Sequence, residues 1–188
     1  MNSLKDQQLI LIALFAALIA ALGLIPPVPF AFGLPITAQS LGIMLCGLLL
    51  GPWRGALAVA LFLLVTTLGA PLLAGGRGGF AVWVSPTAGF LVGYLLAPLM
   101  IGWLFKRLRA LPILPAALLS SVLGGILFLH LCGIIGFSLV TGRTLLDATL
   151  VMWVFWPGDL IKAVLAALVV QSVYKALPHW RWHQVGSA

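Results

Sequence analysis

The feature that most constrains this chain is a series of long apolar segments, separated by short stretches rich in proline, glycine and charge. Of its 188 residues, 63% are hydrophobic and 7% are charged, whereas a soluble domain carries about 25% charged residues. A transmembrane helix needs about 20 predominantly apolar residues, so the chain has room for roughly five to seven spans. The sequence therefore predicts an all-α integral membrane protein.

The boundaries of the apolar segments predict six transmembrane helices in one bundle, a single membrane domain that covers residues 1–188. The expected helices cover residues 7–24, 36–50, 53–70, 80–105, 114–139 and 148–177. Lys5 and the apolar run behind it resemble a signal peptide, but no convincing cleavage site precedes Pro26. We therefore expect an uncleaved first helix.

The last apolar segment contains Pro157, which leaves two alternatives for its structure. It forms one helix with a kink at the proline, or a short segment precedes a helix that has Pro157 as its first residue. We favour the second alternative. Asp159 would then lie in the first turn of that helix, close to free backbone N–H groups and the positive end of the helix dipole.

The basic residues predict the orientation of the bundle. Six helices place both termini on one side, and basic residues gather in the cytoplasmic loops of membrane proteins. With the termini cytoplasmic, the inner side holds Lys5, Arg54, Lys106, Arg107, Arg109, Lys175 and Arg181. The outer side then holds only Arg77 and Arg143. A net charge of +7 could also suggest a nucleic-acid-binding protein, but the bias toward the cytoplasmic side explains it. We therefore exclude nucleic acid as a partner.

Asp159 and Lys162 are the most informative polar residues, since ionisable side chains inside a span usually face the bundle interior or a ligand cavity. Three residues apart, they share one face of a helix. They form either a structural ion pair or part of a ligand site. Arg77 emerges on the same outer side, so a carboxylate and two cations would converge on an outward-facing cavity, suited to a ligand with N–H donors and a carboxylate.

Other residues near the expected outer side extend this candidate site. Gly76 belongs to a glycine-rich stretch around Arg77 that forms either a loop over the cavity or a plain connecting turn. Thr37, Gln39 and Ser40 either bind the ligand or cap the second helix. Trp83 belongs to a group of aromatic residues that form an interfacial belt or wall the apolar part of a ligand.

The sequence offers little support for catalysis or metal binding. His130 stands alone in an apolar segment, and we interpret it as a packed or hydrogen-bonded helix histidine. An intramembrane enzyme that uses His130 or Asp159 remains an alternative, although no motif pairs a nucleophile with a base. A structural subunit without a ligand is a further alternative, and it predicts an Asp159–Lys162 pair with no cavity beside it. We expect no metal and no cofactor.

Ala13 and Ala17 lie four residues apart in the first helix. Small residues with this spacing let another helix approach closely, either inside the bundle or from a partner protein.

Four segments together resemble BioY, the biotin-specific S component of energy-coupling factor (ECF) vitamin transporters. The matching segments are PITAQ at residues 35–39, GAPLLAGGRGG at 69–79, SPTAGF at 85–90 and PGDLIKA at 157–163. They spread over nearly the whole chain, and the second and fourth are the more specific. Ser40 departs from the stretch that relatives often carry after the glutamine.

The resemblance implies a six-helix S component of the plasma membrane of a prokaryote that captures biotin near the outer face. It implies a T component and two ATPase subunits as partners, with Ala13 and Ala17 facing the T component. This chain has no phosphate-binding loop for ATP, so a driving force would come from such partners. The family's aspartate, lysine and loop arginine fall on Asp159, Lys162 and Arg77. A different vitamin, and a homo-oligomer in place of the ECF assembly, remain alternatives.

Overall fold

The computed structural model describes residues 3–28 and 34–177, and the regular structure within them is helical. In chain order the elements are α1 (Ser3–Gly23), α2 (Gln39–Leu45), η2 (Cys46–Leu50), α3 (Pro52–Thr67), η3 (Phe80–Val84), α4 (Ala88–Arg107), α5 (Ile113–Ser120), η4 (Ser121–Leu127), α6 (Phe128–Thr141), α7 (Leu145–Met152), η5 (Trp153–Phe155) and α8 (Trp156–Ala176). Of the short elements, η2 and η4 are π-helical, whereas η3 and η5 are 3₁₀ turns. Extended pairing in these residues is confined to two isolated bridges, Val28 with Ile36 and Leu73 with Arg77.

Six helical stretches stand where the sequence predicts apolar helices. Four of them are long and apolar enough to cross a membrane, and two are shorter. The long stretches are Asp6–Gly23, Ala88–Arg107, Ile113–Thr141 and Leu145–Ala176, and the short ones are Gln39–Leu50 and Pro52–Thr67. Large hydrophobic side chains remain exposed along these helices, among them Leu9, Leu64 and Leu150. This distribution is that of a membrane protein whose outer surface faces lipid.

One stretch differs in detail from the sequence expectation, and a second agrees with the alternative that we favoured. The helix expected over residues 80–105 is interrupted, because a 3₁₀ turn ends at Val84 and α4 begins only at Ala88. Ser85 is extended, at φ −90° and ψ 163°, since a residue that precedes a proline is pushed out of the helical region. At the other proline, α8 begins at Trp156 with Pro157 in its first turn, which is close to the second alternative above.

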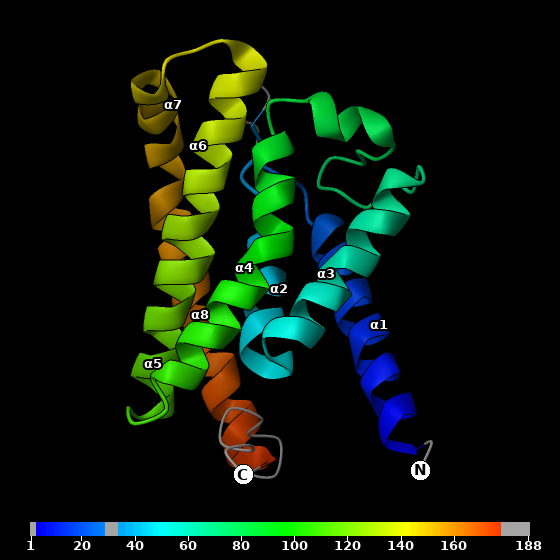
Figure 1. The fold of residues 1–188 in the computed structure, drawn as a ribbon, viewed down its shortest axis with the longest axis vertical. Coiled ribbons are helices and arrows are strands. Elements are labelled where there is room, and N and C mark those ends of the chain that lie inside the picture. The colour runs from blue at the N-terminus through cyan, green and yellow to red at the C-terminus, as the bar shows by residue number, and fades with distance from the viewer. Residues whose placement is uncertain (1–2, 29–33, 178–188) are drawn as a thin grey trace.

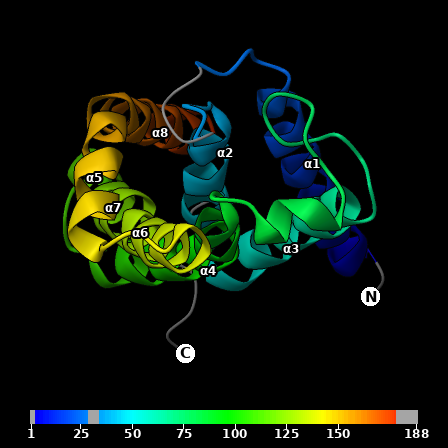
Figure 2. The ribbon, with the colours of Figure 1, turned by 90° about the horizontal axis from the view of Figure 1, so that it is seen from above.

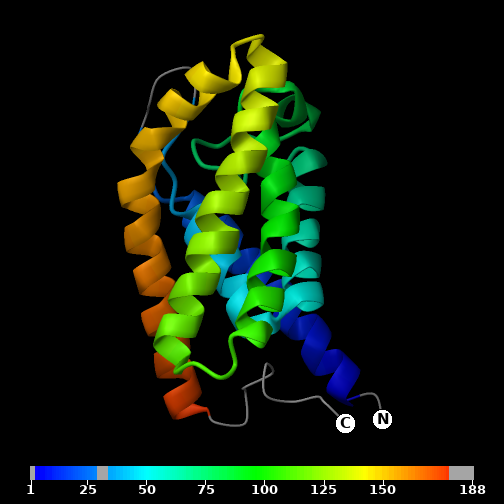
Figure 3. The same ribbon diagram turned by 60° about the vertical axis from the view of Figure 1, so that its left-hand side comes forward.

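The helices form two rows of three, as Figure 2 shows from above. One row contains α8, α2 and α1, and the other contains α6, α4 and α3. Within the rows, α2 packs between α1 and α8, while α4 packs between α3 and α6. Contacts of α1 with α3 and of α2 with α4 join the rows. The first turn of α1 and the last turn of α8 lie at the same end of the bundle (Figures 1 and 3).

Two neighbouring helices of the second row, α4 and α6, approach closely where two glycines face each other. A Cβ atom at Gly136 of α6 would lie 2.6 Å from the backbone nitrogen of Gly89 in α4. A Cβ atom at Gly89 would lie 2.8 Å from the Cα atom of Gly136. Because both obstacles are backbone, only a separation of the two helices would relieve such a contact.

We therefore expect Gly136→Ala to lower the free energy of unfolding by about 1–3 kcal/mol, the range for overpacked sites. Gly158→Ala is the matched control, because a Cβ atom there meets only Ile36, at 3.9 Å. Thermal unfolding of both variants in the same detergent measures the difference. Equal melting temperatures would contradict the close approach of α4 and α6.

Candidate functional site

Asp159 and Lys162 form an ion pair inside the bundle. The Lys162 Nζ atom lies 2.8 Å from Asp159 Oδ1, and the two side chains are 15% and 8% exposed, respectively. Asp159 lies in the first turn of α8, as expected if the helix begins near Pro157. The positive end of the helix dipole and the ammonium group therefore both stabilise the carboxylate.

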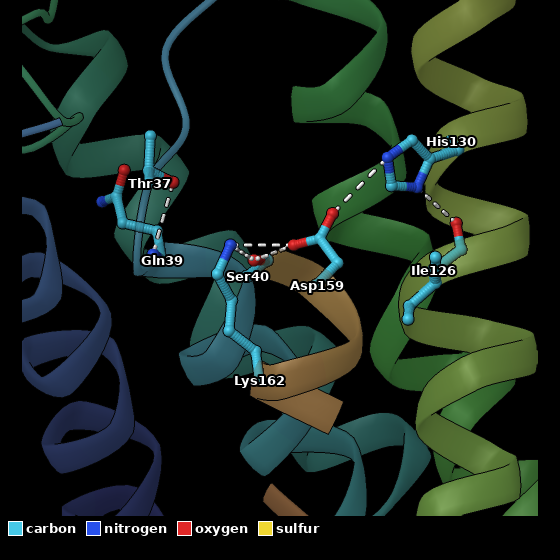
Figure 4. A network of polar contacts seen from close by, with 7 residues as sticks. All are labelled: Thr37, Gln39, Ser40, Ile126, His130, Asp159 and Lys162. Carbon is cyan, nitrogen blue, oxygen red and sulfur yellow. Dashed lines mark hydrogen bonds and ion pairs between the residues drawn. The ribbon is translucent and has the colours of Figure 1, made fainter. Parts of the chain in front are cut away.

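Ser40 of α2 completes a triangle with this pair (Figure 4). Its hydroxyl donates to Asp159 Oδ1 at 3.1 Å and accepts a hydrogen bond from Lys162 Nζ at 3.0 Å. Ser40 is 119 residues from Asp159 in the chain and is 5% exposed. The serine therefore connects α2 to α8 at the ion pair.

His130 approaches the second carboxylate oxygen from α6. Its Nε2 atom lies 3.4 Å from Asp159 Oδ2, and its Nδ1 atom lies 2.9 Å from the carbonyl oxygen of Ile126 (Figure 4). The bond to Ile126 agrees with our interpretation of a packed or hydrogen-bonded helix histidine, which did not include the contact with the carboxylate. One signal was present in the sequence, because an ionisable residue inside an apolar span is a functional candidate by default.

A cavity lies beside the ion pair. It measures about 40 Å³ and is lined by Leu34, Pro35, Thr37, Ser40, Phe90, Tyr94, Leu129, Phe155, Asp159 and Lys162. The polar groups occupy one side, and aromatic and aliphatic side chains supply the rest. A purely structural ion pair predicts no adjacent cavity, so this arrangement disfavours that alternative.

Gln39 precedes Ser40 in α2, but its side chain points elsewhere and does not line this cavity. Its Nε2 group donates to the carbonyl oxygens of Ile19 in α1, at 3.2 Å, and of Leu72, at 3.0 Å. Its Oε1 atom accepts from the backbone nitrogen of Ala74 at 3.1 Å. Gln39 thus holds the end of α1 and the segment after α3 together around the start of α2.

Arg77 lies in the segment after α3 and is likewise absent from the cavity lining. Its guanidinium donates to the carbonyl oxygen of Ala74 at 3.3 Å and to Thr87 Oγ1 at 3.2 Å. Burial lowers the pKa of Arg77 from its ordinary value, and an interaction with Tyr94, which does line the cavity, opposes that effect. The exposed Gly76 beside it has a φ of +71°, a conformation that favours glycine.

Trp83 and the two alanines of α1 lie away from the cavity. The Trp83 indole donates to Thr67 Oγ1 at 2.8 Å, and its ring lines an apolar groove on the side of the bundle with Phe80 and Leu95. Ala13 and Ala17 are both exposed on α1, so neither packs inside the bundle.

The geometry does not pair a nucleophile with a base. The Ser40 hydroxyl donates to Asp159 and not to His130, so the imidazole is not placed to take its proton. Among the described residues, no group of three or more His, Cys, Asp or Glu side chains is arranged to hold a metal ion. The arrangement is suited to binding a polar group at the end of an apolar ligand.

Comparison with protein families gives one match over nearly the whole chain. The sequence model of the BioY family matches residues 1–179.

Individual relatives and a solved structure agree with that match. The biotin transporter BioY of Rhodobacter capsulatus is 47% identical over 182 residues, covering 92% of this chain and 96% of that protein. The probable biotin transporter BioY of Bacillus subtilis is 41% identical over 175 residues, covering 93% of this chain and 94% of that protein. A crystal structure of the S-component for biotin from an ECF-type ABC transporter has a TM-score of 0.88 at 35% identity, covering 93% of this chain and 94% of that chain.

Proposed function

This chain belongs to the BioY family, and on that premise we propose that it is a biotin-binding S component that captures the vitamin for uptake by an ECF-type transporter. Members of this family are transport proteins, so the alternative of an intramembrane enzyme is set aside. The observation that supports the proposal within this chain is the ion pair of Asp159 and Lys162 at the wall of a cavity.

Biotin matches the polar and apolar sides of this cavity. Its ureido group carries two N–H donors and one carbonyl acceptor, and its thiophane ring is apolar. Asp159 accepts from the ureido N–H groups, while Lys162 donates to the ureido oxygen. Phe90, Leu129 and Phe155 line the cavity and supply the apolar contact for the ring.

The size of the cavity implies that its wall moves when biotin binds. A volume of about 40 Å³ is far below the roughly 300–1,000 Å³ of sites for drug-sized ligands. Leu34 and Pro35 line the cavity from the connection between α1 and α2. We propose that the wall formed by Leu34 and Pro35 opens, because neither residue is part of a helix.

Arg77 is the cation that we assign to the biotin carboxylate. It is held by Ala74 and Thr87 beside the cavity residue Tyr94, whereas the Lys162 ammonium is already engaged by Asp159 and Ser40. Biotin therefore lies with its ureido group toward α8 and its carboxylate toward the segment that contains Arg77. Gln39 bonds to that segment at Ala74, and Gly76 belongs to it.

We place six membrane spans in this chain, with both termini cytoplasmic. Figure 1 shows the start of α3 and the end of α4 toward the end of the bundle that holds the first turn of α1 and the last turn of α8. Arg54, Lys106 and Lys175 belong to these turns of α3, α4 and α8. The connections that follow α3 and α6, which contain Arg77 and Arg143, lie toward the opposite end (Figure 1). Arg181, which the sequence also places inside, lies outside the described residues. The site would then open to the outside of the plasma membrane, and the bilayer would be thin around Gln39–Leu50.

The partners that follow from this function are a T component and two ATPase subunits. Ala13 and Ala17 are exposed on α1 beside Leu14, which is 58% exposed, and this face is the one that we assign to the T component. A homo-oligomer that uses the same face is the competing assembly.

Asp159→Asn should weaken biotin binding at least about tenfold. Loss of a charged partner costs ~2–5 kcal/mol, and 1.4 kcal/mol corresponds to about a factor of ten. Asp147→Asn is the matched control, because it makes the same substitution at an exposed carboxylate of α7. Isothermal titration of the purified proteins with biotin measures both. Unchanged affinity in Asp159→Asn would reject the assignment, and tighter binding of thiamin or riboflavin by the wild type would reject biotin.

Arg77→Met should weaken the binding of biotin but leave that of biotin amide nearly unchanged, because the amide lacks the carboxylate charge. Lys162→Met should weaken both ligands, because Lys162 acts at the ureido end. Arg143→Met removes another outer-end arginine and serves as the control. If Lys162→Met instead weakens biotin and spares biotin amide, then Lys162 binds the carboxylate and Arg77 does not.

The double variant Ala13→Trp/Ala17→Trp should lose most of its co-purification with a T component and its ATPases, while biotin affinity stays within about twofold. Bulky rings on this face block a close helix–helix contact. Ala176→Trp, at an exposed alanine in the last turn of α8, is the control. Full retention of the partners by the double variant would place the docking surface elsewhere, and loss of a homo-oligomer alone would favour the competing assembly.

A further inference from the structure

His130 is a buried titratable residue to which the proposed function gives no role. Its side chain lies on α6 and is 3% exposed. Three aromatic rings surround it, those of Phe90, Phe155 and Trp156, with centroids 6.0, 6.4 and 6.1 Å from the imidazole. Its Nε2 atom has no hydrogen-bond partner among the described residues, and it faces Asp159 Oδ2 at 3.4 Å.

The contact at the other ring nitrogen determines which tautomer is present. A backbone carbonyl only accepts hydrogen bonds, so the Nδ1 atom, 2.9 Å from the Ile126 oxygen, must carry a proton. In the neutral ring, Nε2 then carries no proton and presents a lone pair. The carboxylate that it faces is held in its ionised form by Lys162 Nζ, 2.8 Å from Oδ1. A lone pair opposite an anionic oxygen is unfavourable in a medium of low dielectric constant.

One additional proton converts this contact into an attraction. We propose that His130 takes up a proton at Nε2 when the ligand binds, and that the imidazolium then fixes the Asp159 carboxylate in its ligand-binding position. His130 is therefore a positioning residue, and ligand binding is coupled to proton uptake from solution. This inference rests on the proposed function, because biotin is the ligand whose binding reports the coupling.

The carboxylate is already paired with one cation, because Lys162 lies against Asp159 Oδ1. An imidazolium would add one positive charge beside this ion pair, at the second carboxylate oxygen.

The other titratable and charged groups near His130 come from several elements. Asp159 and Lys162 lie near His130 from α8. Tyr94 of α4 interacts with Asp159, and Cys132 follows His130 by two residues in α6. Arg77 interacts with Tyr94 from the segment after α3. The ordinary pKa values of these side-chain types are about 4 for carboxyl groups, about 6.5 for histidine and about 8.5 for cysteine. Those of tyrosine, lysine and arginine are about 10 or higher. Between pH 5.5 and 8, histidine is the side chain expected to titrate.

Biotin titrations of the wild type and of His130→Gln at several values between pH 5.5 and 8 test the proposal. A glutamine keeps an N–H donor near Asp159 but cannot take up a proton. The dissociation constant of the wild type for biotin should rise by about tenfold in total between pH 5.5 and 8. Uptake of a single proton limits its slope to about tenfold per pH unit. The dissociation constant of His130→Gln should stay within about twofold. A flat wild-type profile, or the same slope in the variant, would overturn the inference.

Nuclear magnetic resonance of ring-¹⁵N-labelled histidine tests the proton without requiring biotin. Substitution of the other two histidines, His179→Asn and His183→Asn, leaves His130 as the single signal. The neutral ring should be protonated at Nδ1, and a proton should add at Nε2 between pH 5 and 8, at a higher pH when biotin is present. A neutral ring protonated at Nε2, or no titration, would overturn the inference. The expected titration in a protein that binds no biotin would instead reject the proposed function.

Discussion

The rest of the structure depends on one buried carboxylate in an apolar bundle. Asp159 is 6% exposed, and an unpaired charge at such a position costs several kcal/mol. Lys162 of α8 and Ser40 of α2 compensate this cost, and His130 of α6 approaches the second carboxylate oxygen. Helices from both rows of the bundle therefore converge on one side chain, and the cavity lies where they meet.

Close backbone packing makes this convergence possible. Gly136 and Gly89 bring α6 against α4, which in turn carries Phe90 and Tyr94 to the wall of the cavity. On the opposite side, Tyr174 of α8 donates to the carbonyl oxygen of Leu48 at 3.1 Å and ties α8 to the short helical stretch that contains Ser40. The site is thus fixed by contacts far from the ligand. A shift of one row against the other would separate His130 of α6 from Asp159 of α8.

Local features of the sequence predicted much of this arrangement. Apolar run lengths predicted the helices, Pro157 indicated where α8 begins, and the three-residue spacing predicted the Asp159–Lys162 contact. The contact of His130 depends on how α6 packs beside α8, which no local pattern encodes. The same limit applies to Gln39, since its bonds to Ile19 and Leu72 join segments that are distant in the chain. Predictions succeeded within one helix and failed where two elements had to meet.

Gln39 and Ser40 connect the two surfaces that the proposed function requires. Ser40 bonds to Asp159 at the cavity, and the adjacent Gln39 bonds to the carbonyl oxygen of Ile19 in α1. Ile19 lies in the same helix as the exposed Ala13 and Ala17, about half a turn beyond Ala17 and less than two turns beyond Ala13. A displacement of α1 by a partner would pull first on Gln39 and, through the first turn of α2, on Ser40. The start of α2 is therefore the shortest covalent and hydrogen-bonded route by which a partner docked on α1 would loosen the hold on the ligand.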